Sequence, residues 1–342
     1  MVKSLRGAFA AICGQCVRGR SSDLRNYHAR VRRAVVLLAA GVALALAFLL
    51  ALGGVGDDPD KLTNWQALVL GVVQGATELL PISSSGHLIL VPWLFDWTYL
   101  EQNDAFNQTF DVSLHLGTCI AVGAYFWHDV VELVRAWVGT LRRRSIATPS
   151  ERLAWAVVVA TIPAALVGFA LEDPIADHLG DPWQIAIFLA AFGLLLGWAD
   201  RRPAPDSLER VTVRRGLWVG LAQCLALMPG VSRSGITITA SRFLGLDRDA
   251  SARFSFLLLL PITLGAVLFK GLTDVILADL PSGTTGPFVV GVLASLGTGL
   301  VAILWLLDYI RRHTYDLFVV YRVPLAIAIL LLIATGVRSA TF

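Results

Sequence analysis

Polar and ionisable side chains gather in two short stretches of an otherwise apolar chain. The first, residues 71–86, reads GVVQGATELLPISSSG and is followed by a histidine; the second, residues 220–235, reads GLAQCLALMPGVSRSG. One stretch offers a carboxylate, an imidazole and several hydroxyls, and the other offers a guanidinium with further hydroxyls. The candidate site residues are Gln74, Glu78, Ser83, Ser84, Ser85 and His87 from the first stretch, and Ser232, Arg233, Ser234 and Thr237 from the second.

These residue types together describe a phosphate-binding site with acid–base capability. Gln74 and Glu78 are one helical turn apart and therefore share a helix face. Residues 83–87 begin a new half-helix, whose free N–H groups and positive dipole end suit an anion. Arg233 presents a planar fork that matches two phosphate oxygens. Because a carboxylate repels a phosphate unless a cation lies between them, we expect Mg²⁺ or Ca²⁺ to be held by Glu78 and phosphate oxygens.

The composition places these residues in a membrane protein. Of the 342 residues, 56% are hydrophobic and only 15% are charged, and the mean hydropathy is +0.68. Soluble domains carry about 25% charged residues. The apolar residues here form blocks that reach the roughly 20 residues needed to span a bilayer. Ionisable side chains at that depth are costly and are functional by default.

Two pairs of apolar segments are too short for each member to span a membrane. They are 65–80 with 86–95 and 216–228 with 236–245, and each pair is interrupted by a Pro/Ser/Gly-rich stretch. Such interrupted segments at corresponding places in two halves are typical of inverted repeats that bind a ligand near the membrane centre. The two stretches also align without gaps, with identities at Gly71 and Gly220, Gln74 and Gln223, Ser83 and Ser232, Ser85 and Ser234, and Gly86 and Gly235.

The distribution of charge predicts the orientation, because cytoplasmic loops collect Lys and Arg. The segments expected inside are 1–33, 135–152, 200–215, 246–253 and 308–317, and those expected outside are 56–64, 172–182 and 273–286. These assignments agree only if each short pair enters and leaves on one side. The first pair then dips in from outside and the second from inside.

The predicted fold is therefore an all-α polytopic membrane protein with an inverted-topology repeat. It has two re-entrant helical pairs, about six core transmembrane helices and one extra N-terminal helix. Residues 1–33 form a basic cytoplasmic tail, and residues 34–55 form the extra helix. The membrane domain covers residues 64–337, with one repeat at about 64–172 and the other at about 216–307.

At these residues the chain resembles the undecaprenyl-diphosphate phosphatase family, known for bacitracin resistance. The first family motif stands here as QGATELLPISSSGH at 74–87, and the second as PGVSRSG at 229–235, followed by Thr237. The stretches FDVSLHLGT at 110–118 and FSFLLLLPITLGA at 254–266 are also similar to the family. The resemblance covers roughly residues 64–337 and rests on two long motifs in the right order.

The resemblance implies hydrolysis of undecaprenyl diphosphate to undecaprenyl phosphate and inorganic phosphate, which recycles the carrier for peptidoglycan synthesis. It implies that Glu78 is the essential acidic residue, Ser84 the nucleophile or a phosphate ligand, His87 the catalytic histidine and Arg233 the phosphate clamp. Position 74 is Gln, which the motif permits, so the metal assignment rests on Glu78. The remaining candidates are expected to bind substrate: Gln74, Ser83, Ser85, Ser232, Ser234 and Thr237.

Two mechanisms stay open at this point. Ser84 attacks phosphorus with His87 as base, or His87 or Glu78 activates water directly. Asp111 and His115, on the following helix, are expected to lie behind the site.

Three function classes also stay open. The rival to the enzyme is a lipid-phosphate flippase that uses the same residues without cleavage, and a purely structural membrane protein explains neither Glu78 nor Arg233. The expected partners are the lipid substrate and the bilayer of the inner (plasma) membrane, with the site facing outside and with no nucleic acid. The oligomeric state is open, a homodimer included.

Overall fold

The computed structural model describes residues 33–52, 61–97, 99, 104–270 and 285–341. The described part is helical, with no strand beyond an isolated bridge between Asp206 and Leu246, so the all-α prediction is confirmed. After an N-terminal helix, Arg33–Leu52, the helices are α2 (Asn64–Leu79), α3 (Ser84–Phe95), α5 (Asp104–Tyr125), α6 (Trp127–Arg143), α7 (Pro149–His178), α8 (Pro182–Asp200), α9 (Val213–Gln223), α10 (Arg233–Phe243), α11 (Arg248–Lys270), α12 (Thr285–Tyr309) and α13 (Asp316–Ala334).

Six of the described helices are long and apolar enough to cross a membrane: Arg33–Leu52, Pro149–Leu171 of α7, α8, Arg248–Leu268 of α11, α12 and α13. The predicted helix at 34–55 is among them over its described residues. α5 is as long as these helices, but it carries Asp111 and His115 in its middle. It is therefore not apolar enough to be included among the candidate membrane spans. Five core spans therefore meet the criterion where the sequence predicted about six.

One predicted loop is largely helical. Residues 135–152 were expected to form a cytoplasmic loop, yet α6 continues to Arg143 and α7 already begins at Pro149. α6 is strongly amphipathic, with charged residues on one face and apolar residues on the other. A helix of this kind looks polar when its residues are averaged, although one face is apolar.

α2 and α3 form one helical hairpin, and α9 and α10 form a second one with a short 3₁₀ segment, Cys224–Leu227, before its turn. The N-cap residues of α3 and α10 are Ser83 and Ser232, whose φ angles are 78° and 76°. Each serine Oγ accepts a hydrogen bond from the N–H of the glycine three residues later, Gly86 or Gly235. The two N-caps at the ends of the aligned stretches therefore have the same backbone conformation.

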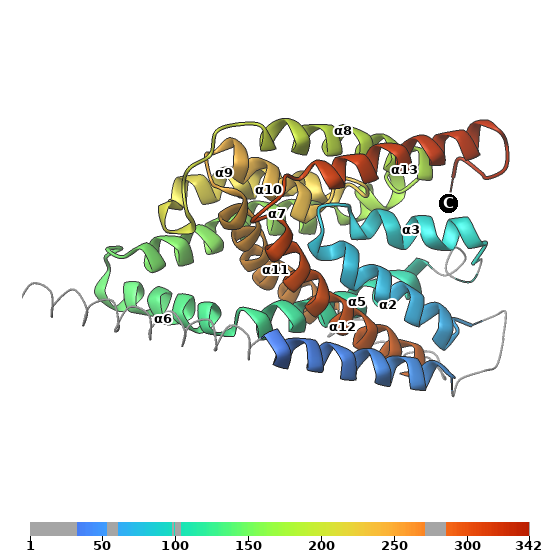
Figure 1. The fold of residues 1–342 in the computed structure, drawn as a ribbon, viewed down its shortest axis with the longest axis horizontal. Helices are drawn as coiled ribbons and strands as arrows, with labels where there is room; N and C mark the ends of the chain where they lie inside the picture. Colours follow the sequence, from blue (N-terminus) through green and yellow to red (C-terminus); the bar gives the residue numbers. More distant parts are fainter. Residues whose placement is uncertain (1–32, 53–60, 98, 100–103, 271–284, 342) are drawn as a thin grey trace, which may run out of the picture.

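The tips of the two hairpins meet inside the helical bundle, with the hairpins arriving from opposite ends of the molecule (Figure 1). The Gly230 N–H donates to Ser83 Oγ at 3.1 Å, and the Ser234 hydroxyl donates to the carbonyl oxygen of Leu80 at 3.0 Å. Two hydrogen bonds donated by the second hairpin to the first therefore hold the two tips together.

Arg322 of α13 is fully buried and binds both turns through backbone oxygens. Its Nη1 donates to Pro81 O at 3.1 Å, and its Nη2 donates to Gly230 O at 2.9 Å and to Val231 O at 3.1 Å. Its Nε donates to Leu189 O of α8 at 2.9 Å. One guanidinium thus satisfies three carbonyl groups of the turns and also binds a carbonyl of α8.

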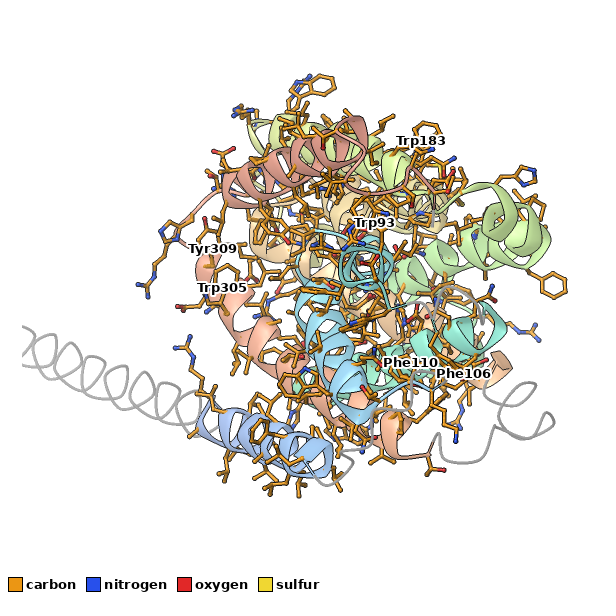
Figure 2. The ribbon with its side chains drawn as sticks, turned by 90° about the vertical axis from the view of Figure 1, so that its right-hand side faces the viewer. Trp93, Phe106, Phe110, Trp183, Trp305 and Tyr309 are labelled. Carbon is orange, nitrogen blue, oxygen red and sulfur yellow. The ribbon has the colours of Figure 1, made fainter. Side chains whose placement is uncertain are left out.

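α12 packs closely against α2 and α5 because glycines remove the side chains between them. A Cβ at Gly71 would lie 2.4 Å from Gly291 O, and one at Gly75 would lie 1.9 Å from Thr298 Oγ1. At one end of α12, the aromatic rings of Phe106 and Phe110 on α5 pack edge-on against Phe288 (Figure 2). This close packing fixes α2, whose last turn carries Glu78, against the rest of the bundle.

Replacing Arg322 should destabilise the protein strongly. Arg322→Met leaves the carbonyl groups of both turns without a donor, and each buried unsatisfied acceptor costs about 1–3 kcal/mol. The apparent melting temperature in detergent should fall by about 5 °C or more. Arg202→Met is the control, because that guanidinium lies over the Trp198 ring near the molecular surface. Equal melting temperatures for the two variants would contradict the structural role of Arg322.

Candidate active site

The candidate site is centred on Glu78, a buried carboxylate in the last turn of α2. Its Oε1 accepts a hydrogen bond from Arg233 Nη2 at 2.8 Å. Its Oε2 accepts from Ser84 Oγ at 2.5 Å and from Gln74 Nε2 at 3.2 Å. His115 Nε2 lies 3.4 Å from the same oxygen. Four side chains from four helices, α2, α3, α5 and α10, therefore converge on a single carboxylate.

The turn between α2 and α3 explains why Glu78 and Ser84 meet. Leu80 has extended torsions, φ −73° and ψ 143°, because a following proline disfavours the helical conformation. The chain reverses over the next residues and Ser84 begins α3. Glu78 therefore ends one helix where Ser84 begins the next. Ser84 and Arg233 occupy the same position in the two hairpins, directly after the N-cap serine.

Arg233 is held between the two halves of the site. Besides its contact with Glu78, its Nη1 donates to the carbonyl oxygen of Ser255 on α11 at 2.9 Å. The Ser255 hydroxyl in turn accepts from Thr237 Oγ1 at 2.7 Å. The guanidinium fork is therefore oriented by a carboxylate on one side and a fixed backbone oxygen on the other, as a planar side chain allows and an ammonium does not.

The two histidines near the site have different surroundings. His115 Nδ1 lies 2.7 Å from Asp111 O and its Nε2 faces Glu78. Both nitrogens face oxygen acceptors, which suits a ring that carries two protons. His87 Nδ1 lies 2.6 Å from Ser83 O, and its Nε2 lies 2.7 Å from the hydroxyl of Tyr321. The group bonded to Ser84 is thus Glu78 rather than His87, and the base role of His87 stays a prediction.

The serines and the threonine that remain among the predicted site residues lie at the N-caps or in the first five residues of α3 and α10, where their oxygens already have partners. Ser83 and Ser232 cap helices, and Ser85 and Ser234 lie 3.5 Å and 3.2 Å from these capping hydroxyls. Thr237 Oγ1 lies within hydrogen-bond distance of the carbonyl oxygens of Arg233 and Ser234 and of Ser255 Oγ. These contacts shape the turns, and direct contact of these hydroxyls with a substrate stays a prediction.

Three residues outside the two motifs were not predicted: Ser255, Tyr321 and Arg322. Arg322 had a signal, because it is a lone cation within the apolar run of α13, and a charge at membrane depth is functional by default. Tyr321 and Ser255 had none, since tyrosine and serine are common in membrane helices. His115 was expected behind the site and instead contacts Glu78 directly.

The donor set for a metal ion is small. Within the described part of the chain, no group of three or more His, Cys, Asp or Glu side chains could hold one. Gln74 Oε1, however, is buried without a hydrogen-bond partner, next to the carboxylate of Glu78. Two oxygens of this kind suit a hard cation that takes its other ligands from phosphate and water, so the residues fit Mg²⁺ or Ca²⁺ bound together with a phosphate.

The chain matches a family of known proteins over most of its length. The family model described as bacitracin resistance protein BacA matches residues 67–328. An undecaprenyl-diphosphatase of Thermomicrobium roseum is 47% identical over 280 residues, covering 79% of this chain and 98% of that protein. Undecaprenyl-diphosphatases of Pelotomaculum thermopropionicum and Nocardioides sp. are 44% and 41% identical, each over 80% of this chain and 98% of their own length.

Arg233→Lys should abolish most phosphatase activity although it keeps the charge. Lysine cannot contact two oxygens in the geometry of the guanidinium fork. Losing one hydrogen bond to a charged group costs about 1.5–3 kcal/mol, or roughly ten- to two-hundred-fold in rate. Steady-state phosphate release measures the effect, with Arg202→Lys as the control for an exposed arginine. Turnover of Arg233→Lys near that of the unmodified protein would contradict the clamp.

Proposed function

The chain belongs to the bacitracin resistance protein BacA family, and we propose that it is an undecaprenyl-diphosphatase. It is a multi-pass membrane protein. It hydrolyses undecaprenyl diphosphate to undecaprenyl phosphate and inorganic phosphate. The observation that supports this most directly is the convergence of Glu78, Ser84 and Arg233 at the meeting point of the two hairpins. The flippase alternative is not favoured, because a carrier does not need a hydroxyl bonded to a carboxylate.

The contact between Ser84 and Glu78 supports a covalent mechanism. Ser84 Oγ attacks the terminal phosphorus, its proton passes to Glu78 Oε2, and the bridging P–O bond breaks to release undecaprenyl phosphate. Water then hydrolyses the phosphoserine and releases inorganic phosphate. The alternative is direct attack by water, with Glu78 or His87 as the base. The 2.5 Å bond favours the serine route, because it pairs the nucleophile with its proton acceptor.

Arg233 supplies positive charge where the phosphoryl oxygens develop negative charge. Donors fixed in advance stabilise a transition state more than mobile ones do, and Arg233 is fixed by Glu78 and Ser255. It also changes the argument for a metal, because the protein itself provides a cation beside Glu78. Charge balance at Glu78 alone therefore no longer demands a metal ion.

We retain a divalent cation, Mg²⁺ or Ca²⁺, in the proposal because of Gln74. Its unpaired Oε1 and the carboxylate of Glu78 would hold the ion together with substrate oxygens. When bound, such an ion neutralises charge on the diphosphate. Gln74 and Glu78 would orient it through their shared helix face.

The two hairpins are proposed to be re-entrant halves of an inverted repeat. The matching cap geometry of Ser83 and Ser232 supports the repeat, and the opposite directions of the hairpins support the inversion. Irregular backbone at membrane depth is tolerated when it is buried in protein or lines a wet cavity, and the turns are buried here. Self-association into a homodimer stays a prediction.

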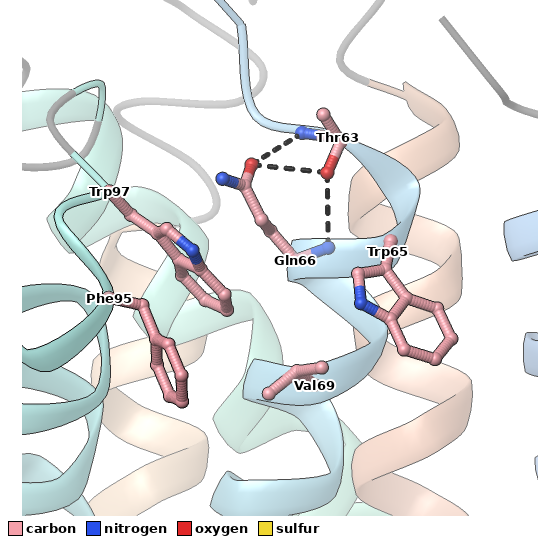
Figure 3. A pocket seen from close by; sticks show the side chains of 6 residues that line it. All are labelled: Thr63, Trp65, Gln66, Val69, Phe95 and Trp97. Atoms are coloured by element: carbon pink, nitrogen blue, oxygen red, sulfur yellow. Dashed lines mark hydrogen bonds between the residues drawn. The ribbon is translucent and has the colours of Figure 1, made fainter. Parts of the chain in front are cut away.

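The first hairpin is proposed to open to the outside of the inner membrane. Its open end holds a hollow of about 470 Å³ lined by aromatic and polar side chains, as at a membrane–water interface (Figure 3); the lining residues are Thr63, Trp65, Gln66, Val69, Phe95 and Trp97. The opposite end holds a hollow of about 520 Å³ with several arginines, as expected for the cytoplasmic side. These are Arg201, Arg202, Arg242, Arg248 and Arg311.

The purified full-length protein should release inorganic phosphate from undecaprenyl diphosphate. EDTA should lower the rate by about tenfold or more, and Mg²⁺ or Ca²⁺ should restore it, if a metal stabilises phosphoryl charge. The two parts of the experiment test separate claims. An absence of phosphate release under all conditions contradicts the diphosphatase, whereas full activity in EDTA contradicts only the metal.

Ser84→Ala separates the two mechanisms by the size of its defect. Losing a nucleophile costs several powers of ten, whereas losing one hydrogen bond to a charged phosphate costs roughly ten- to two-hundred-fold. Ser85→Ala is the matched control, because Ser83 also caps α3 and binds Gly230. A Ser84→Ala defect no larger than that of Ser85→Ala would make Ser84 a ligand and favour direct attack by water.

A further inference from the structure

Tyr321 of α13 contacts the active site from outside both motifs. Its hydroxyl lies 2.7 Å from His87 Nε2, and the two rings stack with centroids 5.7 Å apart and planes 13° from parallel. The next residue, Arg322, donates hydrogen bonds to backbone carbonyls of both turns. Adjacent residues of one helix thus fix the backbone of the site and the ring of its histidine.

The hydrogen bonds of His87 define which nitrogen carries the proton. Ser83 O lies 2.6 Å from Nδ1 and can only accept, so Nδ1 carries a hydrogen. The Tyr321 hydroxyl can donate or accept, and it donates to the Nε2 lone pair when the ring carries its one hydrogen on Nδ1. In the neutral ring, Nε2 is then the proton acceptor. His115, with an oxygen acceptor at each nitrogen, has no such lone pair available.

We propose that Tyr321 is a positioning residue of the diphosphatase. Its hydroxyl holds His87 in the Nδ1–H tautomer and in the observed ring orientation, so that Nε2 is ready to accept a proton. Ser84 and His87 are three residues apart on α3 and therefore lie on the same helix face. In the second step the Tyr321 hydroxyl turns away and leaves Nε2 to the attacking water, while Ser83 keeps Nδ1 fixed.

This arrangement gives each step of the covalent reaction its own base. Glu78 takes the proton of Ser84 in the first step and is then protonated. In the second step water gives a proton to His87 Nε2, its oxygen bonds to phosphorus, and the P–Oγ bond breaks. Ser84 Oγ recovers its proton from Glu78, and His87 afterwards loses its proton to solvent. The inference rests on the proposed diphosphatase activity and adds Tyr321 as the residue that prepares His87.

The test is a double-mutant cycle on the purified full-length protein. Tyr321→Phe keeps the ring stack and removes the hydroxyl, so kcat for undecaprenyl diphosphate should fall about two- to tenfold while KM stays unchanged. In a His87→Gln background the same change should have no further effect, because Tyr321 acts through His87. A loss by the same factor in both backgrounds, or no loss in either, overturns the proposal.

Tyr309→Phe is the matched control. Tyr309 also stacks on a histidine, His313, with centroids 4.5 Å apart and planes 10° from parallel, but it lies at the arginine-bearing end of α12, away from the two turns (Figure 2). It should leave kcat unchanged. A Tyr321→Phe variant that behaves like Tyr309→Phe contradicts a positioning role.

A spectroscopic arm tests the proposal independently of activity. In protein labelled with ¹⁵N-histidine, the His87 resonances should report the Nδ1–H tautomer, and Tyr321→Phe should shift the Nε2 resonance. An unchanged Nε2 resonance overturns the inference even if the enzyme is active. If the unmodified protein releases no phosphate but the resonance shifts as expected, the proposed function fails while the contact between Tyr321 and His87 stands.

Discussion

Backbone polar groups buried in the two hairpin turns are the constraint on which the rest of this structure depends. A helix satisfies its own peptide groups, but the two buried turns at the hairpin tips cannot. The protein satisfies them with side chains: Arg322 serves carbonyls of both turns, and Ser83 and Ser234 each bond to the opposite turn. The same bonds hold Glu78, Ser84 and Arg233 within contact. The hydrogen bonds that pair the buried peptide groups of the turns therefore also assemble the site.

The sequence predicted the hairpins well because their boundaries are local. Proline after Leu80 stops α2, and serine caps start α3 and α10, so the helices end within a few residues of the predicted segments. The grouping of Gln74, Glu78, Ser84 and Arg233 also followed from local spacing and the repeat. The residues that contact this group could not be predicted from local spacing. The acceptors of Arg322 are backbone carbonyls, which leave no trace in a sequence, and the contact of Tyr321 with His87 joins positions far apart in the chain. α6 was missed because an amphipathic helix resembles a charged loop when only its charges are read.

Charge in this site is balanced locally rather than by solvent. A carboxylate buried among apolar helices is stable only if paired and hydrogen-bonded, and Glu78 has Arg233, Ser84 and Gln74 as partners. When a diphosphate enters, these donors have a second anion to serve. The carboxylate of Glu78 therefore holds Arg233 in position to bind phosphate. When Arg233 binds the phosphate, the proton that Glu78 takes from Ser84 neutralises the carboxylate.

The repeat explains why two similar hairpins form one site and not two. At equivalent places the first hairpin has Glu78, Ser84 and His87, whereas the second has Leu227, Arg233 and Ile236. The cap conformation is shared, since both caps are serines with positive φ, but the two hairpins carry different chemical groups. One half carries the acid–base and nucleophilic groups, and the other carries the cation. Two carboxylates at the tips would repel each other and the substrate, and two arginines would leave no proton acceptor. The shared fold thus brings together unlike residues, and the reaction requires that they be unlike.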